Sequence, residues 1–500
     1  MYSRQYRAVL QKLFSIAALA VTLTACGGDE PVPEGAVGHV KKYFGGVTAD
    51  EPHAALIGRD VLSAGGTAGD AVAAMAFALM VTRPDSAGAG GGGICLGYDP
   101  ETNKAEALEF LPHPARARPP AGRWVGTAPG SFRGLFVFHA RYGKLRWEQI
   151  VFPAERLARF GVDTSKSFVL ALQQSSAHLQ HRPSTASRFF PNGKMLAIRD
   201  RLVQPDLAGT LGRIRIVGPG DFYEGKLSND FVGAVGALGG WLSKDDLRDY
   251  RPRWLTPEKL EFGNHAIFFA PSPALGGQVA GQLWRALGNR SSFLKAKESR
   301  RLAALANAAH RAYAMPNLGS STSRSSAGVA AMDRSGRAAA CVLTMNRSFG
   351  VGRLAGETGM IPAPPADLDS TLGLVPVVMA NTHTEQGYLV ATGAGDRFAP
   401  LSLVSVLLRL QNSSQPKLAD AIASPRVAPL TGQQSLFENA GADAVAAIRS
   451  TGRQIVAAGP MGISSVNVLI CTDGVRDEPN SCRIAADQRR GAYAVNAEKY

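Results

Sequence analysis

The sequence predicts a mixed α/β fold in which helices cover β-sheets, and three observations support this prediction. The 500 residues are 45% hydrophobic and 19% charged, which is enough apolar material for a large buried core. Segments with helical periodicity alternate along the chain with short apolar segments that are typical of strands. These strand segments show little polar alternation, as expected for strands that are covered on both faces.

Local patterns predict the individual elements in chain order. Apolar positions at helical spacing predict helix over residues 52–82, with a break at Gly65 and Gly66. Further helices are predicted within 143–160, over 242–250 with Ser243 as N-cap, and over 400–410. Strands are predicted at 94–98, 105–110, 266–270, 329–332, 338–345, 388–392 and 466–471.

The beginning of the chain has the pattern of an export signal. Basic residues precede an apolar stretch at 13–22, which is too short to span a bilayer, so residues 1–25 are predicted to be a signal peptide. The following Leu-Thr-Ala-Cys-Gly resembles the lipobox of bacterial lipoproteins, which makes Cys26 the predicted lipidation site and residues 26–50 a tether. We therefore expect a lipid-anchored protein of the bacterial cell envelope, facing the periplasm or the outside. The alternative is an ordinary secretory signal with an incidental cysteine.

The remaining cysteines are interpreted in the light of this export. An exported protein can form disulfides. Cys471 and Cys482 flank a turn and a short loop, so they are predicted to form a disulfide. Cys95 and Cys341 lie in apolar runs and are predicted to be buried and unreactive.

Charge and generic motifs exclude several classes of function. The formal net charge is +14, but the basic residues are dispersed, so no nucleic-acid partner is expected. Residues 88–93 match G-x-G-x-x-G, but a strand follows them where a dinucleotide-binding motif has a helix. The nine histidines are dispersed and no G-x-S-x-G occurs, so neither a metal ion nor another cofactor is expected.

An ordered set of longer motifs resembles the gamma-glutamyltransferase family, whose members are also called gamma-glutamyl transpeptidases or glutathione hydrolases. These motifs lie at 64–74, 84–93, 129–131, 142–147, 222–225, 246–252, 271–277, 346–350 and 356–359. The resemblance implies the four-layered αββα sandwich of the N-terminal-nucleophile hydrolases. It also implies one composite domain, made of a large-subunit-like region at 51–325 and a small-subunit-like region at 326–500, which stay associated after self-cleavage.

The resemblance places the nucleophile at Ser326. In the family, the hydroxyl of this residue attacks the preceding carbonyl, and the freed α-amine then serves as the base for the same hydroxyl. Ser326 keeps the hydroxyl that this chemistry requires, although neighbouring serines leave the register open between Ser325 and Ser326. The structural alternative is that Ser326 is one of several hydroxyl residues in a loop.

The resemblance also assigns supporting and substrate-binding positions. Thr344 takes the role of supporting the nucleophile. The positions for contacts to a small amide substrate fall on Asn346, Asp367, Gly393, Gly395 and Asp396, with the backbone of the last three forming an oxyanion pocket, and Arg426 is a further candidate.

Other positions depart from the family pattern. Leu111 stands where the family has an arginine for the substrate carboxylate, and a leucine cannot form that ion pair. Because losing such a pair costs roughly 2–5 kcal/mol, we expect poor use of glutathione. Two hypotheses stay open: an amide hydrolase or acyl transferase for γ-glutamyl or related small amides, and a catalytically inactive, uncleaved binding lipoprotein of the envelope.

Overall fold

The computed structural model describes residues 44–288, 291–314, 326–411, 417–430, 432–438, 441–459 and 462–497. The predicted signal peptide, Cys26 and residues 26–43 of the predicted tether lie outside these ranges, as does Ser325. All described residues belong to one unit of the chain, residues 42–498.

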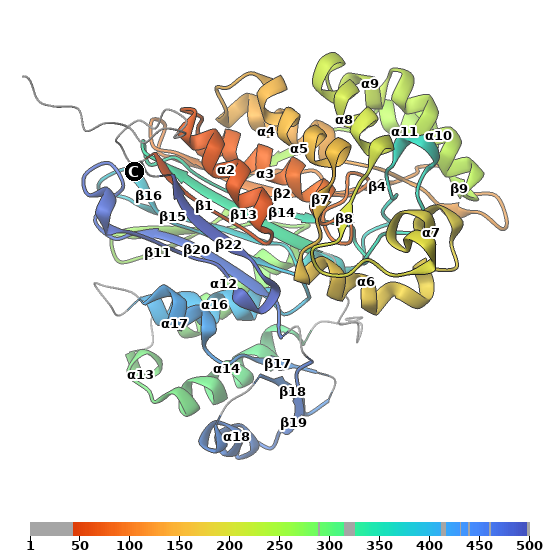
Figure 1. The fold of residues 1–500 in the computed structure, drawn as a ribbon. Helices are drawn as coiled ribbons and strands as arrows, with labels where there is room; N and C mark the ends of the chain where they lie inside the picture. The colour runs from red at the N-terminus through yellow and green to blue at the C-terminus, as the bar shows by residue number, and fades with distance from the viewer. Residues whose placement is uncertain are drawn as a thin grey trace, which may run out of the picture. The chain divides into compact units, whose positions relative to one another are not determined.

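Two antiparallel sheets form the centre of this unit (Figure 1). The seven-stranded sheet has the order β10 (Arg253–Leu255), β3 (Lys104–Glu109), β2 (Gly92–Asp99), β14 (Ala338–Thr344), β13 (Ser326–Asp333), β1 (Gly45–Ala49) and β22 (Tyr493–Ala497). The six-stranded sheet has the order β11 (Glu258–Phe262), β12 (His265–Phe269), β15 (Val375–Asn381), β16 (Gln386–Ala394), β20 (Ser465–Cys471) and β21 (Cys482–Ala485).

The two sheets pack face to face, and helices cover their outer faces. The layer between the sheets is apolar and includes Leu96 and Met332 from the seven-stranded sheet and Val378 and Leu469 from the six-stranded sheet. Helices on the seven-stranded sheet include α2 (Pro52–Ser63), α3 (Ala68–Thr82), α4 (Ser131–Tyr142) and α5 (Trp147–Phe160). Helices on the six-stranded sheet include α12 (Leu275–Leu287) and α16 (Ala399–Leu410), and α14 (Glu298–Ala312) packs against these two helices. The fold is therefore the predicted αββα sandwich.

The remaining elements lie around this sandwich. The helices among them are α6 (Lys166–Leu179), α7 (Pro183–Phe189), α8 (Pro205–Val217), α9 (Gly220–Tyr223), α10 (Lys226–Ala237), α11 (Lys244–Arg248), α13 (Ser291–Leu294), α15 (Leu368–Leu372), α17 (Leu418–Ala423) and α18 (Ala442–Arg449). The strands are β4 (His113–Pro114), β5 (Trp124–Val125), β6 (Thr127–Ala128), β7 (Val162–Asp163), β8 (Arg201–Leu202), β9 (Gly240–Trp241), β17 (Val427–Pro429), β18 (Gln434–Phe437) and β19 (Gln454–Ala457). Short 3₁₀ turns occur at Pro191–Gly193 (η1), Gly356–Thr358 (η2), Pro479–Ser481 (η3) and Gln488–Arg490 (η4).

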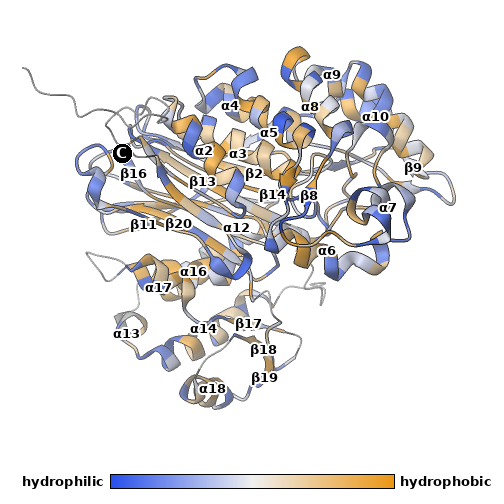
Figure 2. Cartoon of the chain, in the orientation of Figure 1, coloured by the Kyte–Doolittle hydropathy of each residue, from blue (hydrophilic) through white to orange (hydrophobic). Residues whose placement is uncertain are grey.

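Local sequence signals explain why the central helix α3 begins where it does. Thr67 and Asp70 form a capping box, in which the Thr67 hydroxyl accepts the N–H of Asp70 and the Asp70 carboxylate accepts the N–H of Thr67. All fifteen residues of α3 are buried, and Figure 2 shows much of this helix as hydrophobic. A helix that is apolar all round is expected in the interior, here between the seven-stranded sheet and the outer helices.

The sheets combine strands from both sides of the predicted cleavage point. In the seven-stranded sheet, β13, β14 and β22 follow Ser325, whereas β1, β2, β3 and β10 precede it. The predicted tether is wrong at its end, because Gly45–Ala49 form β1, hydrogen-bonded between β13 and β22. Five residues of Gly-Gly-Val-Thr-Ala carry too little pattern to predict a strand, and pairing on both sides is what orders them.

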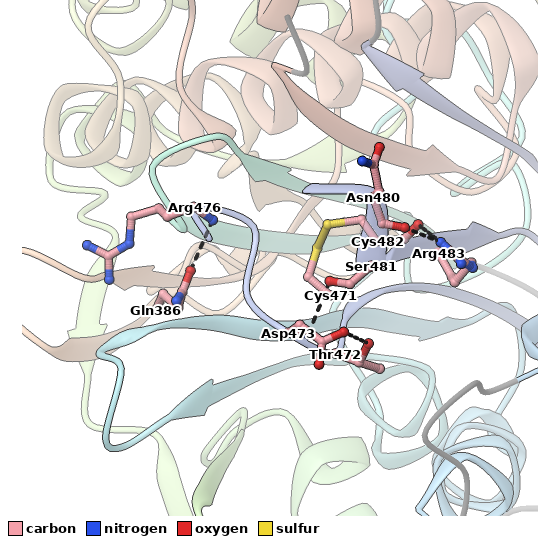
Figure 3. Close-up of a disulfide and its surroundings, with 9 residues drawn as sticks. All are labelled: Gln386, Cys471, Thr472, Asp473, Arg476, Asn480, Ser481, Cys482 and Arg483. Atoms are coloured by element: carbon pink, nitrogen blue, oxygen red, sulfur yellow. Dashed lines mark hydrogen bonds between the residues drawn. A yellow bond between two sulfur atoms is a disulfide. The ribbon is translucent and has the colours of Figure 1, made fainter. Parts of the chain in front are cut away.

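Two disulfides join neighbouring strands. Cys471 and Cys482 are cross-strand partners on β20 and β21 and are bonded, as predicted (Figure 3). The Ser481 hydroxyl, within the loop that this bond closes, accepts the N–H of Asp473 at 3.1 Å. Cys95 and Cys341 are buried as predicted, but they too are bonded, because β2 and β14 place them directly opposite each other. Their separation of 246 residues leaves no local signal for this pairing.

Among the described residues, no helix is both long enough and apolar enough to cross a membrane.

Candidate functional site

Ser326 is the first residue of β13 and lies at the edge of the layer between the two sheets. Its side chain faces the six-stranded sheet, on the same face of β13 as Gly328, which approaches Thr392 of β16. The Ser326 residue is only 3% exposed. Its Oγ donates to the carbonyl oxygen of Gly373 at 2.8 Å and accepts the N–H of Gly395 at 2.8 Å. Ser326 is thus an ordered hydroxyl at the end of a strand and not part of a loop.

Glycine is required at both positions that contact this hydroxyl. A Cβ at Gly373, the residue after α15, would come within 2.9 Å of Ser326 Oγ. Gly395 follows β16 with a φ of +109°, and a Cβ there would overlap the guanidinium of Arg490. The missing side chain at Gly373 lets the backbone approach the nucleophile. The N–H of Gly395 bonds Oγ directly and favours the deprotonated form of this hydroxyl.

Thr344 lies directly across from Ser326 in the pairing of β13 with β14. Its Oγ1 accepts the N–H of Asn346 at 2.8 Å, so the turn after β14 is fixed beside the nucleophile. Asn346 adopts a φ of +59° and donates from Nδ2 to the carbonyl of Pro364 at 2.8 Å. Its buried Oδ1 has no hydrogen-bond partner among the described residues, which leaves an acceptor beside the site for a substrate donor.

Asp50, which the sequence analysis missed, joins the start of β13 to the six-stranded sheet. Its Oδ2 accepts the N–H of Gly328 at 2.7 Å. Its Oδ1 accepts Ser465 Oγ at 2.5 Å and Asn467 Nδ2 at 2.8 Å. This buried carboxylate therefore fixes the strand that carries Ser326 against β20. No local signal could identify it, because its partners lie 278 to 417 residues away.

The residues predicted to form an oxyanion pocket lie at the end of β16 and in the turn after it. Of Gly393, Gly395 and Asp396, only Gly395 contacts Ser326 Oγ within the described structure. Gly393 lies inside β16, between Val375 and Val466, so its backbone belongs to the sheet.

The side chain of Asp396 has a positioning role, which the prediction for its backbone did not include. Its carboxylate accepts the N–H and hydroxyl of Ser464 and pairs with Arg490 at 2.9 Å. The turn that presents the Gly395 N–H is therefore held by a buried ion pair and not by substrate.

The acidic candidate Asp367 is also used locally. Its Oδ1 accepts the N–H of Ser370 at 2.8 Å, which makes it the N-cap of α15. Asp369, two residues later, pairs instead with Arg397 at 3.3 Å, near the turn at Gly395. Burial raises the pKa of Asp369, although the Arg397 charge opposes this shift. The capping role of Asp367 was not predicted, because it depends on where α15 begins.

Arg426 is a structural residue. It is 2% exposed and forms an ion pair with Asp487 at 2.6 Å, and its Nη1 donates to the carbonyl of Ile463 at 2.6 Å. Burial lowers the pKa of Arg426, whereas the Asp487 charge raises it. These bonds direct Arg426 toward the backbone that precedes β20, away from a substrate role.

No three potential metal ligands among His, Cys, Asp and Glu come together in the described part of the chain. The groups gathered around Ser326 are hydroxyl, amide and backbone groups, and this set suits acyl transfer to an alcohol.

Comparisons with known proteins agree with this geometry. Residues 54–323 match the sequence model of the family described as Gamma-glutamyltranspeptidase. The glutathione hydrolase proenzyme of Pseudomonas aeruginosa is 31% identical over 268 residues, covering 51% of this chain and 47% of that protein. The corresponding proenzyme of Escherichia coli is 24% identical over 420 residues, covering 70% of this chain and 72% of that protein. The chain spans about half the length of most of the curated relatives that it matches best.

A solved structure resembles nearly the whole fold. Cephalosporin acylase from Bacillus halodurans superposes with a TM-score of 0.75 at 18% identity, covering 94% of this chain and 99% of that one. At this identity the similarity concerns the fold alone, and it extends to the region after Ser326.

Proposed function

Since this chain belongs to the gamma-glutamyltranspeptidase family, we propose that it is an N-terminal-nucleophile amide hydrolase or acyl transferase. It would act on small amides of the γ-glutamyl or a related type, after cleaving itself between Ser325 and Ser326. The single observation that carries the proposal is the environment of Ser326 Oγ. This hydroxyl is buried at a strand end, opposite Thr344 and 2.8 Å from the N–H of Gly395.

Self-cleavage uses the hydroxyl of Ser326 first. Oγ attacks the carbonyl carbon of residue 325, the C–N bond breaks, and the Ser326 nitrogen takes the proton to become an amine. Water then hydrolyses the resulting ester, which frees the hydroxyl and leaves a carboxylic acid on residue 325. Negative charge develops on the carbonyl oxygen of residue 325 during this attack. The N–H of Gly395 positions Oγ and favours the loss of its proton.

Substrate turnover repeats the same chemistry on an external amide. The free α-amine of Ser326 takes the hydroxyl proton, Oγ bonds to the amide carbon, and the amine leaving group departs with a proton. Water, or an acceptor amine, then releases the acyl group and restores the hydroxyl. The unpartnered Oδ1 of Asn346 is suited to accept a hydrogen bond from the substrate.

The two fragments would stay together after cleavage. Both sheets contain strands from before and after Ser325, so separating the fragments would open every layer of the sandwich. The proposal therefore predicts a cleaved protein that still behaves as one particle in solution.

We also propose that the protein is exported and anchored by lipid at Cys26. The two disulfides support an oxidising compartment, since disulfides are uncommon in the cytosol. Replacing Cys26 by serine should move the protein from the membrane fraction to the soluble fraction. Membrane association that is unchanged in Cys26→Ser would contradict the anchor.

Cleavage is tested on a denaturing gel with N-terminal sequencing. The wild-type chain should give two fragments, the smaller beginning at Ser326, whereas Ser326→Ala should stay intact. Ser325→Ala is the matched control, because it removes the neighbouring hydroxyl and should still be cleaved. A single intact chain for the wild type would reject the enzymatic proposal and favour the inactive, uncleaved binding lipoprotein.

A further inference from the structure

An open groove of about 600 Å³ lies between helices α2 and α5, in the helical layer over the seven-stranded sheet. Val61 of α2 lies on one wall, and Phe152 and Phe160 of α5 lie on the other. No residue that bonds Ser326 Oγ lines the groove, so it is separate from the site described above. The function proposed above does not account for it.

Apolar side chains are exposed to solvent along this groove and beside it. Ile150 and the other inward residues of α5 are buried. Phe152 and Phe160, on the groove side of the same helix, are 46% and 62% exposed. Ile216 and Val217, at the end of the neighbouring helix α8, are 71% and 58% exposed. The outer face of a surface helix is normally polar, so an apolar surface of this kind indicates contact with an apolar partner.

Arginine side chains lie among these apolar groups. The guanidinium carbons of Arg156 and Arg215 lie 5.9 Å and 5.6 Å from the ring centroid of Phe152. Arg215 shares the carboxylate of Glu155 with Arg159, so two positive charges face one negative charge. Within the described part of the chain, Arg156 forms no ion pair, and its contact is the ring of Phe152.

The other carboxylates at the groove are balanced by further arginines. Asp60 is the acidic residue among those that line the groove with Val61, and it pairs with Arg59 at 2.7 Å. Arg201, which also lines the groove, lies 3.7 Å from Asp163. The excess positive charge of the arginines around Phe152 is therefore not cancelled. Exposed apolar side chains with arginines between them complement a surface of anionic lipid headgroups.

The predicted tether joins the folded part of the chain beside the groove. A Cβ at Gly45, the first residue of β1, would lie 3.1 Å from a methyl carbon of Leu62, the neighbour of Val61 on α2. The residues from Cys26 to Phe44 span at most about 60 Å when fully extended. With the anchor proposed above, the membrane-bound end of the chain is therefore joined to the fold at the helix that forms the groove wall.

These exposed apolar side chains and the arginines among them are named the α5 surface. We propose that the α5 surface docks on an anionic phospholipid bilayer. The phenylalanine rings enter the boundary between headgroups and acyl chains, and the arginines pair with lipid phosphates. The inference goes beyond the proposed function, because it needs neither self-cleavage at Ser326 nor the modification of Cys26.

The test uses the mature chain, which begins at residue 26, with Cys26→Ser and therefore without lipid or signal peptide. This chain retains the whole unit 42–498. Flotation with vesicles of equal parts phosphatidylcholine and phosphatidylglycerol is compared with flotation with vesicles of phosphatidylcholine alone. Each arginine near an anionic surface contributes about fivefold, so the two unbalanced arginine charges should make binding to the mixed vesicles about 25-fold stronger or more.

A double variant removes the apolar contribution. Phe152→Ser with Phe160→Ser should weaken binding about 15- to 100-fold, because burying the exposed half of each ring is worth roughly fourfold to tenfold. Val456→Ser is the matched control, because Val456 is 38% exposed on β19, which packs with the helices of the six-stranded sheet. This control should bind as the wild type does.

A charge variant removes one of the unbalanced arginines. Arg156→Gln should weaken binding to the mixed vesicles about fivefold and leave binding to phosphatidylcholine unchanged. Arg300→Gln makes the same change of charge at an exposed position of α14 and should leave both unchanged. Melting temperatures equal to that of the wild type verify that each variant is folded.

The outcomes decide between lipid and other occupants. Binding to the mixed vesicles that the phenylalanine and Arg156 variants weaken, and that their controls leave unchanged, supports the proposal. Absence of wild-type binding overturns it, and so does binding that these variants leave unchanged, since such binding would reflect the net charge of the whole protein. A wild-type dimer in analytical ultracentrifugation that the phenylalanine variant converts to a monomer also overturns it, and assigns the α5 surface to a second copy of the chain.

Discussion

Replacing Gly395 by alanine should slow self-cleavage more than it destabilises the fold. Gly395 presents the N–H that bonds Ser326 Oγ at 2.8 Å, and it does so with a φ of +109°. An added Cβ would overlap the guanidinium of Arg490, which is held by Asp396. Either the Arg490 side chain gives up its bond to Asp396 or the backbone shifts, and each change disturbs the turn that presents the N–H.

Two contributions set the size of this effect. A side chain in the positive-φ region costs about 1–2 kcal/mol of stability. Loss of a hydrogen bond to the oxygen that gives up its proton costs about 1.5–3 kcal/mol, which is roughly 10- to 150-fold in rate. The cleavage rate should therefore fall by about tenfold or more, while most of the protein remains folded.

Cell-free synthesis gives the rate, because the small fragment can be followed on a gel from the moment the chain is complete. Gly491→Ala is the matched control. Gly491 also has a positive φ, of +72°, but a Cβ there meets no atom within 4 Å. It should share the conformational cost and cleave at the wild-type rate.

Normal cleavage in Gly395→Ala would refute the role of this N–H. Equal slowing in both glycine variants would show that backbone strain, and not the bond to Ser326, limits the reaction.

Three further changes test the supporting structure. Asp50→Asn places an amide donor against groups that donate to Asp50. The melting temperature should fall, the free energy of unfolding should decrease by about 1–3 kcal/mol, and cleavage should slow. Unchanged cleavage would show that Asp50 does not position the nucleophile. Burial opposes the shift, but the charges of Arg426 and Arg489 lower the pKa of Asp487. The ionised carboxylate therefore stabilises the fold at pH values above its ordinary pKa of 3.8, and this stabilisation is lost as the pH falls through the lowered pKa. Asp487→Asn should cost about 3–5 kcal/mol at pH 7, and its unfolding free energy should approach that of the wild type below pH 3.8; a constant difference in acid would contradict this. Replacing Cys471 and Cys482 by serine should lower the free energy of unfolding by about 3 kcal/mol, the loop-closure value for their separation of 11 residues, as measured by denaturant titration. Self-cleavage, measured on a gel, should be unchanged.

Much of the secondary structure could be predicted because its causes lie within a few residues. The break at Gly65 and Gly66 separates α2 from α3, and Ser243 caps α11 as its position suggests. The strands β13 and β14 both contain the apolar runs from which strands were predicted. The αββα arrangement followed from the ordered family motifs, which carry information about pairing that the local patterns lack.

Roles in the site were harder to predict, because residue type does not reveal which side chains already have structural partners. Asp367 caps α15, and Asp396 is held by Ser464 and Arg490. Each assignment depended on residue type at one position, whereas each outcome depends on which polar groups from distant segments come within hydrogen-bonding distance.

By itself, the sequence predicted several of the central helices and strands, indicated the family, and singled out Ser326, with Ser325 as the alternative register, as the hydroxyl for acyl chemistry. These depend on periodicity, on capping and on motifs, all of which act over short distances along the chain. Only the tertiary structure decided that Asp50 fixes the nucleophile strand and that Cys95 meets Cys341. Such contacts join residues hundreds of positions apart, and they form because the two sheets must bury their facing surfaces against each other.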